Sequence, residues 1–556
     1  MQAQVVRSSR VLRKLRSAFD LAAAALARGC AQDGRIDNAR LDAQQVAAFE
    51  MAWAGAELLA AETSVAALSP ASDPLDVQLA LVFTADAVVS LLDRLDVMYG
   101  EAGLAPAGVD TLRADADWQR LRSEAGSAAA LQAAGRGVVQ VQGAVGEFPL
   151  DEQHALARDA FRRFAEEVVA PQAEAIHRQD LTVPESLLQP MREMGVFGLA
   201  IPERHGGSAP DDREDTLLMV VVTEALSEAS LAAGGSLITR PEILTRALLT
   251  GGTEEQRSHW LPRLAAGDPL CAIAMTEPDC GSDLAACQLK GTRVAGGWAL
   301  NGAKTWCTFA GKAGVLMVVT RTDADRSQGY KGLSILLAEK PSFDTHEFEV
   351  VQEGGGRLTG RAIPTIGYRG MHSFDLAFDN YFVPDANVVG GEAGLGKGFY
   401  YTLAGMVGGR MQTSARACGV MRAALRAAVR YAQDRKVFGM PVAEHPLTQA
   451  KLARMGARLA ASRRLAYTVS EMVNTGNGRM EASLVKLLAC RSAEFVTREA
   501  LQMHGGMGYA EETAASRYFV DARVLSIFEG SEETLALKVV ARSLMERALD
   551  PAPAGA

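Results

Sequence analysis

Hydrophobic residues recur at helical spacing in the first quarter of the chain, where one face of a predicted helix carries Leu12, Leu15, Phe19 and Leu26. A second helix is expected over residues 46–62. A third begins where Asp73 suits the N-cap and Pro74 the first turn, and is expected to end before Gly100. Glycines then recur between residues 126 and 149, which predicts a linker.

The pattern changes twice more along the chain. Helical spacing continues from residue 151 to about residue 265, and strand-like spacing follows Cys271. The Gly296-Gly297 turn predicts a hairpin, and further strands are expected at residues 315–320, 333–337 and 374–383. Long helices return from residue 399 to 547, with breaks near Gly439, Gly476 and Gly505.

Composition agrees with an ordinary globular protein. The 556 residues are 48% hydrophobic and 22% charged, which excludes a disordered or fibrous chain. The net charge of −9 argues against non-specific binding of nucleic acid. We expect a mostly α protein with a small β domain, divided into a helical extension (1–147), a helical domain (148–270), a β domain (271–390) and a C-terminal helical bundle (391–556).

The cysteines and histidines offer no obvious metal or disulfide pattern. The seven cysteines are odd in number and form no Cys-x-x-Cys pair, so a reducing, cytoplasmic location is expected. The eight histidines contain no His-Glu-x-x-His motif, and no metal site is expected.

Two segments could be mistaken for targeting or membrane elements. Residues 77–97 are the most apolar stretch, but they carry Asp86 and Asp93 and therefore predict a buried helix and no membrane partner. The first 16 residues hold five basic and no acidic residues, which resembles an organellar transit peptide. We favour the alternative, a solvated basic helix start.

One stretch of the sequence mimics the first of two glycine-rich nucleotide motifs. Gly391, Gly396 and Lys397 follow the spacing of a phosphate loop, but Gly398 stands where that loop needs Ser or Thr to bind magnesium. No Gly-x-Gly-x-x-Gly follows a strand to open a βαβ unit. The sequence therefore predicts a surface turn and no Rossmann site.

Four ordered stretches combine residue types that carry chemistry: AMTEPDCGSD at 274–283, LNGAKTWCT at 300–308, DRKVFG at 434–439, and QMHGG at 502–506 with IFEGS at 527–531. Together they resemble the FAD-dependent acyl-CoA dehydrogenase family over residues 150–548. The resemblance implies a helical domain, a β-barrel-like middle domain and a C-terminal four-helix bundle, preceded here by the extension. It also implies FAD as the cofactor and an acyl-CoA thioester as the substrate.

The reaction that the family performs needs a base for the α proton and an acceptor for the β hydride. A carboxylate in a dry site can serve as the base. By spacing alone, Glu529 would be interpreted as a surface residue at a turn; its IFEGS motif, however, matches the family's base. The resemblance assigns the hydride to flavin N5, and stabilisation of the thioester oxygen to the base's own backbone N–H and a flavin hydroxyl. Gly530 lets the backbone approach the substrate closely.

The resemblance also assigns the cofactor contacts. Thr276 and Thr308 would donate to the flavin ring, Trp306 would flank it, and Ser282 would contact pyrophosphate or pantetheine beside Gly281. The remaining expected contacts are Arg435 and Phe438, which would reach the FAD of a neighbouring subunit, with Gln502, Gly505, Gly506 and Ser531. A lone Trp is more often a core residue, but Thr308 beside Trp306 favours the flavin role.

Three positions depart from the family pattern. Ser531 replaces the usual Thr and keeps a hydroxyl. Glu533 stands where Gln is frequent, and Pro446 where Gln is expected, with Gln449 nearby. The diphosphate contacts are therefore less secure than the flavin contacts.

The acyl group is expected to carry a distal carboxylate. Arg240 lies on the helix that lines the acyl end in the family, where a neutral residue is usual, and Arg410 lies beside the base. Arginine binds carboxylate bidentately. Together with the extension, this pattern resembles family members that convert (2S)-methylsuccinyl-CoA to mesaconyl-CoA in the ethylmalonyl-CoA pathway. Alternatively, Arg240 forms a salt bridge at the pocket rim.

Other functions stay open at this point. A short- or medium-chain fatty acyl-CoA would need an apolar pocket without Arg, and glutaryl-CoA is a further alternative. A flavin monooxygenase or oxidase on this fold typically lacks the carboxylate base, and a non-catalytic scaffold would not need the FAD motifs.

The expected partners follow from the resemblance and from the extension. Electron-transferring flavoprotein is expected as the electron acceptor. The family core assembles as a dimer of dimers through its C-terminal helices. Because the extension's amphipathic helices must bury their apolar faces, we expect them to dock on that surface and limit the assembly to a homodimer. An independent partner-binding domain is the alternative.

Overall fold

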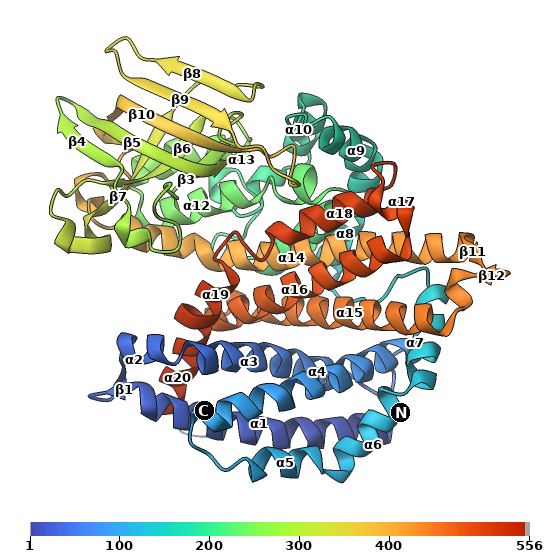
Figure 1. Cartoon of the computed structure of the whole chain (residues 1–556). Helices are drawn as coiled ribbons and strands as arrows, with labels where there is room; N and C mark the ends of the chain where they lie inside the picture. Colours follow the sequence, from blue (N-terminus) through green and yellow to red (C-terminus); the bar gives the residue numbers. More distant parts are fainter. Residues whose placement is uncertain (1, 551–556) are drawn as a thin grey trace. The chain divides into compact units, whose positions relative to one another are not determined.

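The computed structural model describes residues 2–550 and divides into two compact units (Figure 1). One unit comprises Met1–Glu152 with Thr413–Ala556, and the other comprises Gln153–Gln412. The first is helical, and the second joins helices to a β sheet. This is the mostly α architecture with a small β domain that the sequence predicts.

The extension folds into seven helices within residues 2–140. They are α1 (Gln2–Cys30), α2 (Asn38–Ala43), α3 (Gln45–Ala66), α4 (Pro74–Glu101), α5 (Ala107–Arg113), α6 (Ala116–Ala125) and α7 (Ala128–Gln140), with a small hairpin of β1 (Ala31–Gln32) and β2 (Arg35–Ile36). The basic residues of α1 pair with acids of the extension: Arg10 reaches Asp117 at 2.9 Å and Arg16 pairs with Glu62 at 2.6 Å. The N-terminal segment is thus a paired part of the helical fold.

Helix α4 begins as predicted but ends later. The Asp73 carboxylate accepts a hydrogen bond from the Leu75 N–H at 2.8 Å and caps the helix. The predicted end before Gly100 is wrong, because the helix closes at Gly103, where φ is 66° and the Leu104 N–H bonds back to the Tyr99 carbonyl at 2.9 Å. A left-handed glycine just past the last turn ends a helix better than a glycine within it.

Helix α4 is also long and apolar enough to cross a membrane, with a mean hydropathy of 1.8, but 67% of that stretch is buried in the structure. Core helices of many proteins meet the same criterion. Its burial agrees with the prediction of a buried helix.

The predicted linker over residues 126–149 is wrong in its first half, which forms helix α7. Ser127 caps the helix by accepting from the Ala130 N–H at 3.2 Å. A Cβ added at Gly135 would lie 2.0 Å from the Gln449 carbonyl oxygen of helix α15 (Pro446–Asn474). The glycines therefore serve close helix packing rather than flexibility.

The C-terminal part of this unit is a bundle of long helices. It consists of the end of α14 (Gly398–Asp434), the hairpin β11 (Lys436–Val437) and β12 (Met440–Pro441), α15, α16 (Arg479–Met503), α17 (Gly506–Tyr509), α18 (Ala514–Val524), α19 (Glu532–Thr534), the π-helical turn η10 (Leu535–Ala541) and α20 (Arg542–Leu549). The breaks near Gly439, Gly476 and Gly505 fall where the sequence predicts them.

The extension packs on this bundle, where Figure 1 shows α3 and α4 running beside α15. Trp53 of α3 lies in one apolar cluster with Leu484 of α16 and Leu535 of η10. The guanidinium of Arg491 lies 3.8 Å from the centroid of the Trp53 ring, and Arg454 of α15 pairs with Asp86 of α4 at 3.0 Å. The extension thus docks within its own chain on C-terminal helices, as expected.

The second unit begins with helices α8 (Glu152–Phe164), α9 (Ala170–Arg178), α10 (Glu185–Glu193), α11 (Thr216–Ala229), α12 (Thr239–Gly251) and α13 (Glu254–Ala265). Strands follow as β3 (Cys271–Ala274), β4 (Lys290–Val294), β5 (Gly297–Thr308), β6 (Val315–Arg321), β7 (Leu333–Glu339), β8 (Glu347–Val351), β9 (Arg357–Ala362) and β10 (Ser373–Pro384).

These strands form one eight-stranded sheet in the order β3-β6-β4-β5-β10-β9-β8, with β7 paired to β6. The β4–β5 hairpin turns at Gly296 as predicted. The β8–β9 hairpin was not predicted; its strands mix charged and apolar residues, and Arg357 pairs with Glu349 across it at 3.0 Å. Gly391–Gly394 form a short helical turn, and Gly398 begins helix α14, so this segment is a turn as predicted.

Candidate active site

Trp306 is exposed by a bulge in strand β5. The pairing of β5 with β10 shifts register between Phe374 and Leu376, opposite residues 305–306. Trp306 takes a left-handed φ of 56°, and 56% of it is exposed, whereas Lys304 and Cys307 on either side are buried. Bulges re-aim side chains in this way. The exposed indole is the feature expected of a residue that covers a flat ring.

The threonines expected at the flavin lie beside this bulge. The Thr305 N–H donates to the Thr276 carbonyl at 2.9 Å, which aligns the segment after β3 with β5. The Thr308 hydroxyl lies 3.0 Å from the Ser373 hydroxyl, and both Thr276 and Thr308 are half-buried. The fold thus brings Thr276, Trp306 and Thr308 together.

A buried ion pair fixes the loop that follows Thr276. The Glu277 carboxylate accepts from the Lys304 ammonium at 2.8 Å and from the backbone N–H groups of Gln288 and Leu289 at 2.7 and 2.9 Å. Gly281 and Ser282 stand exposed within this loop. The sequence analysis singled out both flanking stretches but missed the Glu277–Lys304 pair, since only the fold places the two residues together.

Glu529 lies at the centre of a tight turn in the other unit. Its φ is 54°, in the left-handed region, and φ of Gly530 is 92°. Non-glycine residues in this region are strained and cluster at functional sites. Within residues 2–550, its carboxylate makes no hydrogen bond or ion pair in the structure, and the side chain is half-buried.

The turn around Glu529 is held from both sides by helix α16. The Lys486 ammonium donates to the Gly530 carbonyl, and the Ser526 hydroxyl donates to the Glu494 carboxylate. The Ser531 hydroxyl accepts from the Thr534 N–H at 3.4 Å and caps α19. These contacts fix the position of the Glu529 backbone.

Phe528, which precedes Glu529, is held by a contact with an arginine. The buried guanidinium of Arg416 lies 4.7 Å from the centroid of the Phe528 ring. Ring and cation attract each other at this distance. Arg416 therefore helps to hold the Phe528 ring in place.

The residues expected to contact the FAD of a neighbouring subunit and the adenine side of FAD lie at two places on the surface of the helical unit. Phe438 is 97% exposed with a φ of 50°, at the tip of the β11–β12 hairpin that Arg435 precedes. Gln502, Gly505 and Gly506 are exposed at the junction of α16 and α17.

Besides Ser531, two positions that depart from the family pattern and the nearby Gln449 have different surroundings. Glu533 is exposed, and Pro446 opens helix α15. Gln449, which stood near the expected Gln, is buried: its amide donates to the Ala443 carbonyl at 3.2 Å and accepts from Arg136 of the extension at 3.3 Å. Gln449 is therefore occupied by the extension and does not replace the missing contact.

Arg240 is buried at the start of helix α12 with 6% exposure. Its guanidinium donates to the Ser236 carbonyl at 2.9 Å and to the Tyr368 hydroxyl at 3.3 Å. Among the residues described, no carboxylate pairs with it. The alternative interpretation, a salt bridge at the pocket rim, is therefore not found within residues 2–550. Tyr368, which the sequence did not mark, is buried with a left-handed φ of 61°.

Arg410 lies on the first half of α14 and is half-buried, with its guanidinium 3.9 Å from the Met406 sulfur.

The fold brings together two clusters of side chains that could bind a metal ion. The spacing of these residues in the sequence does not predict either cluster. One joins Asp180, His346 and His372, and the other joins Glu277, Cys280 and Cys287. In the first, Arg369 already lies 3.5 Å from Asp180. In the second, Lys304 occupies the place of a cation beside Glu277.

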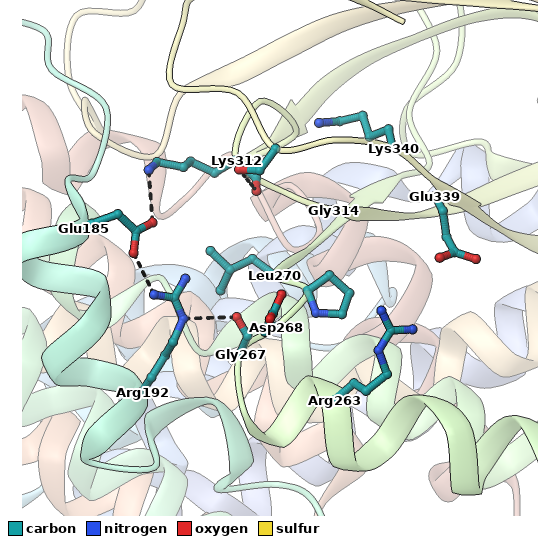
Figure 2. A pocket seen from close by; sticks show the side chains of 12 residues that line it. Glu185, Arg192, Arg263, Gly267, Asp268, Leu270, Lys312, Gly314, Glu339 and Lys340 are labelled. Atoms are coloured by element: carbon teal, nitrogen blue, oxygen red, sulfur yellow. Dashed lines mark hydrogen bonds and ion pairs between the residues drawn. The ribbon is translucent and has the colours of Figure 1, made fainter. Parts of the chain in front are cut away.

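A charged pocket of about 450 Å³ lies between α10, α13 and the ends of β3 and β7 (Figure 2). Its side chains satisfy one another: Glu185 bridges Lys312 at 3.3 Å and Arg192 at 2.7 Å, and Arg192 donates to the Gly267 carbonyl. The Lys340 ammonium donates to two backbone carbonyls, and burial lowers its pKa to about 7. No residue expected at the active site lines this pocket.

Comparison with known proteins covers most of the chain. Profiles for the N-terminal, middle and C-terminal domains of acyl-CoA dehydrogenases match residues 151–268, 272–381 and 396–545. The chain is 40% identical over 399 residues to a (2S)-methylsuccinyl-CoA dehydrogenase of Cereibacter sphaeroides, covering 71% of this chain and 70% of the relative. It is 34% identical to an acyl-CoA dehydrogenase of Bacillus subtilis, covering 69% and 95%.

Solved structures show the same relationship. Butyryl-CoA dehydrogenase from Megasphaera elsdenii aligns with a TM-score of 0.65 at 28% identity, covering 72% of this chain and 99% of that one. Glutaryl-coenzyme A dehydrogenase in complex with glutaryl-CoA aligns with a TM-score of 0.64 at 26% identity, covering 71% and 95%. With three family domains matched in order, the chain belongs to the acyl-CoA dehydrogenase family of oxidoreductases.

Proposed function

We propose that the protein oxidises an acyl-CoA thioester whose acyl chain ends in a carboxylate, with (2S)-methylsuccinyl-CoA as the substrate and mesaconyl-CoA as the product. The observation that carries the proposal is Arg240, a buried guanidinium bonded only to a carbonyl and a hydroxyl within the described residues. A buried charge without a counter-ion is unfavourable. A substrate carboxylate would supply the missing partner.

The groups around Arg240 support this role. Burial raises the pKa of the nearby Cys271 thiol to about 12, although the charge of Arg240 opposes the rise, so the thiol stays neutral. Glu242, two residues further along α12, is engaged by Gln412 and Arg246. Tyr368 contributes a hydroxyl and not a carboxylate to its contact with Arg240.

FAD suits the residues present. The exposed Trp306 beside the hydroxyls of Thr276 and Thr308 offers a flat apolar face with polar groups at its edge, which a flavin ring requires. We assign Gly281, Ser282, Arg435, Phe438, Gln502, Gly505, Gly506 and Ser531 to the rest of the cofactor. When bound, FAD supplies the hydride acceptor.

The chain's own residues supply the acid–base chemistry. Glu529 takes the α proton of the thioester onto its carboxylate, while the turn at Gly530 lets the backbone N–H groups approach the thioester oxygen. Arg240, assisted by Arg410, holds the distal carboxylate and so orients the α and β carbons. The proposal extends to a cytoplasmic homodimer that passes electrons to an electron-transferring flavoprotein, as its family resemblance suggests.

The test is an Arg240→Met variant assayed with methylsuccinyl-CoA and with butyryl-CoA. Removing one partner of a buried ion pair costs roughly 3–5 kcal/mol, so kcat/KM for methylsuccinyl-CoA should fall by at least about 100-fold. Butyryl-CoA, which lacks the distal carboxylate, should lose less than about fivefold. Arg257→Met on the neighbouring helix α13 is the matched control.

Equal losses for the two thioesters would show that Arg240 is structural. Wild-type enzyme that prefers butyryl-CoA or octanoyl-CoA over every dicarboxylic thioester would make the protein a fatty acyl-CoA dehydrogenase instead.

A further inference from the structure

Two cysteines in the segment between β3 and β4 lie in direct contact. The Sγ atoms of Cys280 and Cys287 are 3.1 Å apart, although six residues separate them in sequence. A disulfide requires about 2.05 Å between sulfur atoms. Roughly 1 Å of movement would therefore close the bond.

The surrounding contacts hold both cysteines in this arrangement. The Cys287 thiol lies 3.6 Å from the Met275 carbonyl, and its own carbonyl accepts from the Arg321 guanidinium at 2.9 Å. On the other side, the Glu277 carbonyl accepts from the Cys280 N–H at 3.1 Å. Both cysteines thus lie in the segment between β3 and β4, where separate backbone contacts hold Cys280 and Cys287.

A metal ion is a poorer occupant than a disulfide. The third ligand would be Glu277, whose carboxylate already accepts three hydrogen bonds, one of them from the Lys304 ammonium. Binding a cation there would place it against a buried positive charge. The most accessible reaction of each thiol is therefore with the other thiol.

We propose that Cys280 and Cys287 form a reversible disulfide when the protein meets hydrogen peroxide. Cys280 is 7% exposed and flanked by the exposed Gly281, whereas Cys287 is 1% exposed, so peroxide reaches Cys280 first. The Cys280 sulfur is oxidised to a sulfenic acid as one peroxide oxygen leaves as water. The Cys287 sulfur then attacks it, the S–S bond forms, and the second oxygen leaves as water. Two thiols lose two electrons and two protons, and one peroxide becomes two waters.

The second step uses the Cys287 sulfur as the nucleophile. Burial raises the pKa of the Cys287 thiol to about 12, with the charge of Lys304 opposing the rise. Thiolates are the reactive form of cysteine, so burial disfavours the form of Cys287 that attacks.

The bond would reshape the loop that carries Gly281 and Ser282, since both lie between the linked residues. Displacements of about 1 Å at a binding loop can change function by about 100-fold. On the proposed role of these residues at FAD, we expect the disulfide to weaken FAD binding at least threefold and dithiothreitol to restore it.

The covalent step is tested on the full-length protein by mass spectrometry. Peroxide-treated protein is denatured and alkylated with N-ethylmaleimide; it should take up two fewer labels than the seven cysteines of the reduced protein allow. Digestion with trypsin and an Asp-specific protease separates Cys271 (268–278), Cys280 (279–282) and Cys287 (283–290). A linked pair of the last two peptides, lost on reduction, is the expected result.

Variants make the assignment specific. Cys280→Ser and Cys287→Ser should each lose the linked peptide, and Cys287→Ser should leave a trappable sulfenic acid on Cys280. Cys490→Ser, buried in helix α16, is the control that keeps the link.

Seven labels after peroxide, a link to Cys271, or sulfonic acid on Cys280 without any link would overturn the proposal. So would one zinc ion per chain in the purified protein that is lost in both serine variants. An intact link with unchanged FAD affinity, measured by equilibrium dialysis, would overturn only its effect on the cofactor. Neither mass readout depends on the proposed substrate.

Discussion

Glu529 joins a left-handed backbone to a carboxylate that no described residue engages. Replacing Glu529 with Gln keeps the shape of the side chain but removes the base. We expect FAD to stay bound and turnover to fall by a factor on the order of 10² to 10⁴. Steady-state kinetics with the flavin content measured in parallel would check this.

Glu533→Gln is the matched control, because Glu533 is exposed in the same segment and should leave turnover unchanged. Turnover of Glu529→Gln within threefold of wild type would remove Glu529 from the reaction.

His504, within the motif of residues 502–506, makes stability sensitive to acid. Burial lowers the pKa of His504, and the charge of Arg430 acts in the same direction, while its hydrogen bond to the Ala500 carbonyl opposes the shift. Just below pH 6.5 the unfolded chain therefore binds more protons than the folded one, and stability falls as pH drops through that value.

The unfolding temperature should fall less between pH 8 and pH 5.5 in a His504→Gln variant than in wild type. His205→Gln, in a turn near the surface of the other unit, is the comparison. Parallel pH profiles for wild type and His504→Gln would show that His504 does not contribute.

Single functional residues could be predicted from the sequence only where they belong to a recognisable motif. Glu529 and Trp306 could be marked in advance because their neighbours repeat a family pattern. Tyr368 and the Glu277–Lys304 pair could not, because each depends on contacts between residues far apart in the chain. Gln449 shows the converse: its nearness in sequence suggested a cofactor contact, and the fold gives it to Arg136.

Helices and strands were predictable where one face is apolar or a cap is strong. Asp73-Pro74 marks the start of α4, and the Gly296-Gly297 turn marks the β4–β5 hairpin. Helix α7 was missed because its glycines imitate a linker. The β8–β9 hairpin was missed because its strands are short and charged residues interrupt their apolar ones, although Phe348 and Leu358 are buried.

Gly135→Ala tests the interpretation of α7 as a closely packed helix. The added Cβ would meet the Gln449 carbonyl oxygen at 2.0 Å, a backbone atom that cannot rotate away. Overpacking of this kind costs about 1–3 kcal/mol. Each kcal/mol lowers the unfolding temperature by roughly 2–4 °C in a unit of this size, which calorimetry would detect.

Gly29→Ala in α1 is the matched control, since nothing lies within 4 Å of its added Cβ. It should leave stability unchanged or raise it by up to about 1 kcal/mol. Equal effects of the two substitutions would contradict close packing of α7 on α15.

The whole molecule differs from the shared family core by its extension, which lies before the matched residues 151–545. Its helices bury Trp53 with Leu484 and Leu535 and pair Asp86 with Arg454. We propose that this docking occupies the surface through which family members form a second dimer contact, and so limits the assembly to a homodimer.

Light scattering should give a mass near two chains of 59.0 kDa for the intact protein. Removing residues 1–147 should expose the apolar faces of α15 and α16 and yield tetramers or aggregates. A mass near four chains for the intact protein, or a soluble and active dimer after truncation, would contradict the capping role.

The most direct measurement is the bleaching of the flavin by defined thioesters under anaerobic conditions. Purified protein should be yellow, and stoichiometric methylsuccinyl-CoA should abolish the visible absorbance of the oxidised flavin. Glutaryl-CoA, butyryl-CoA and octanoyl-CoA should bleach it more slowly or not at all. Colourless protein that takes up no FAD, or bleaching by octanoyl-CoA faster than by methylsuccinyl-CoA, would contradict the proposed function.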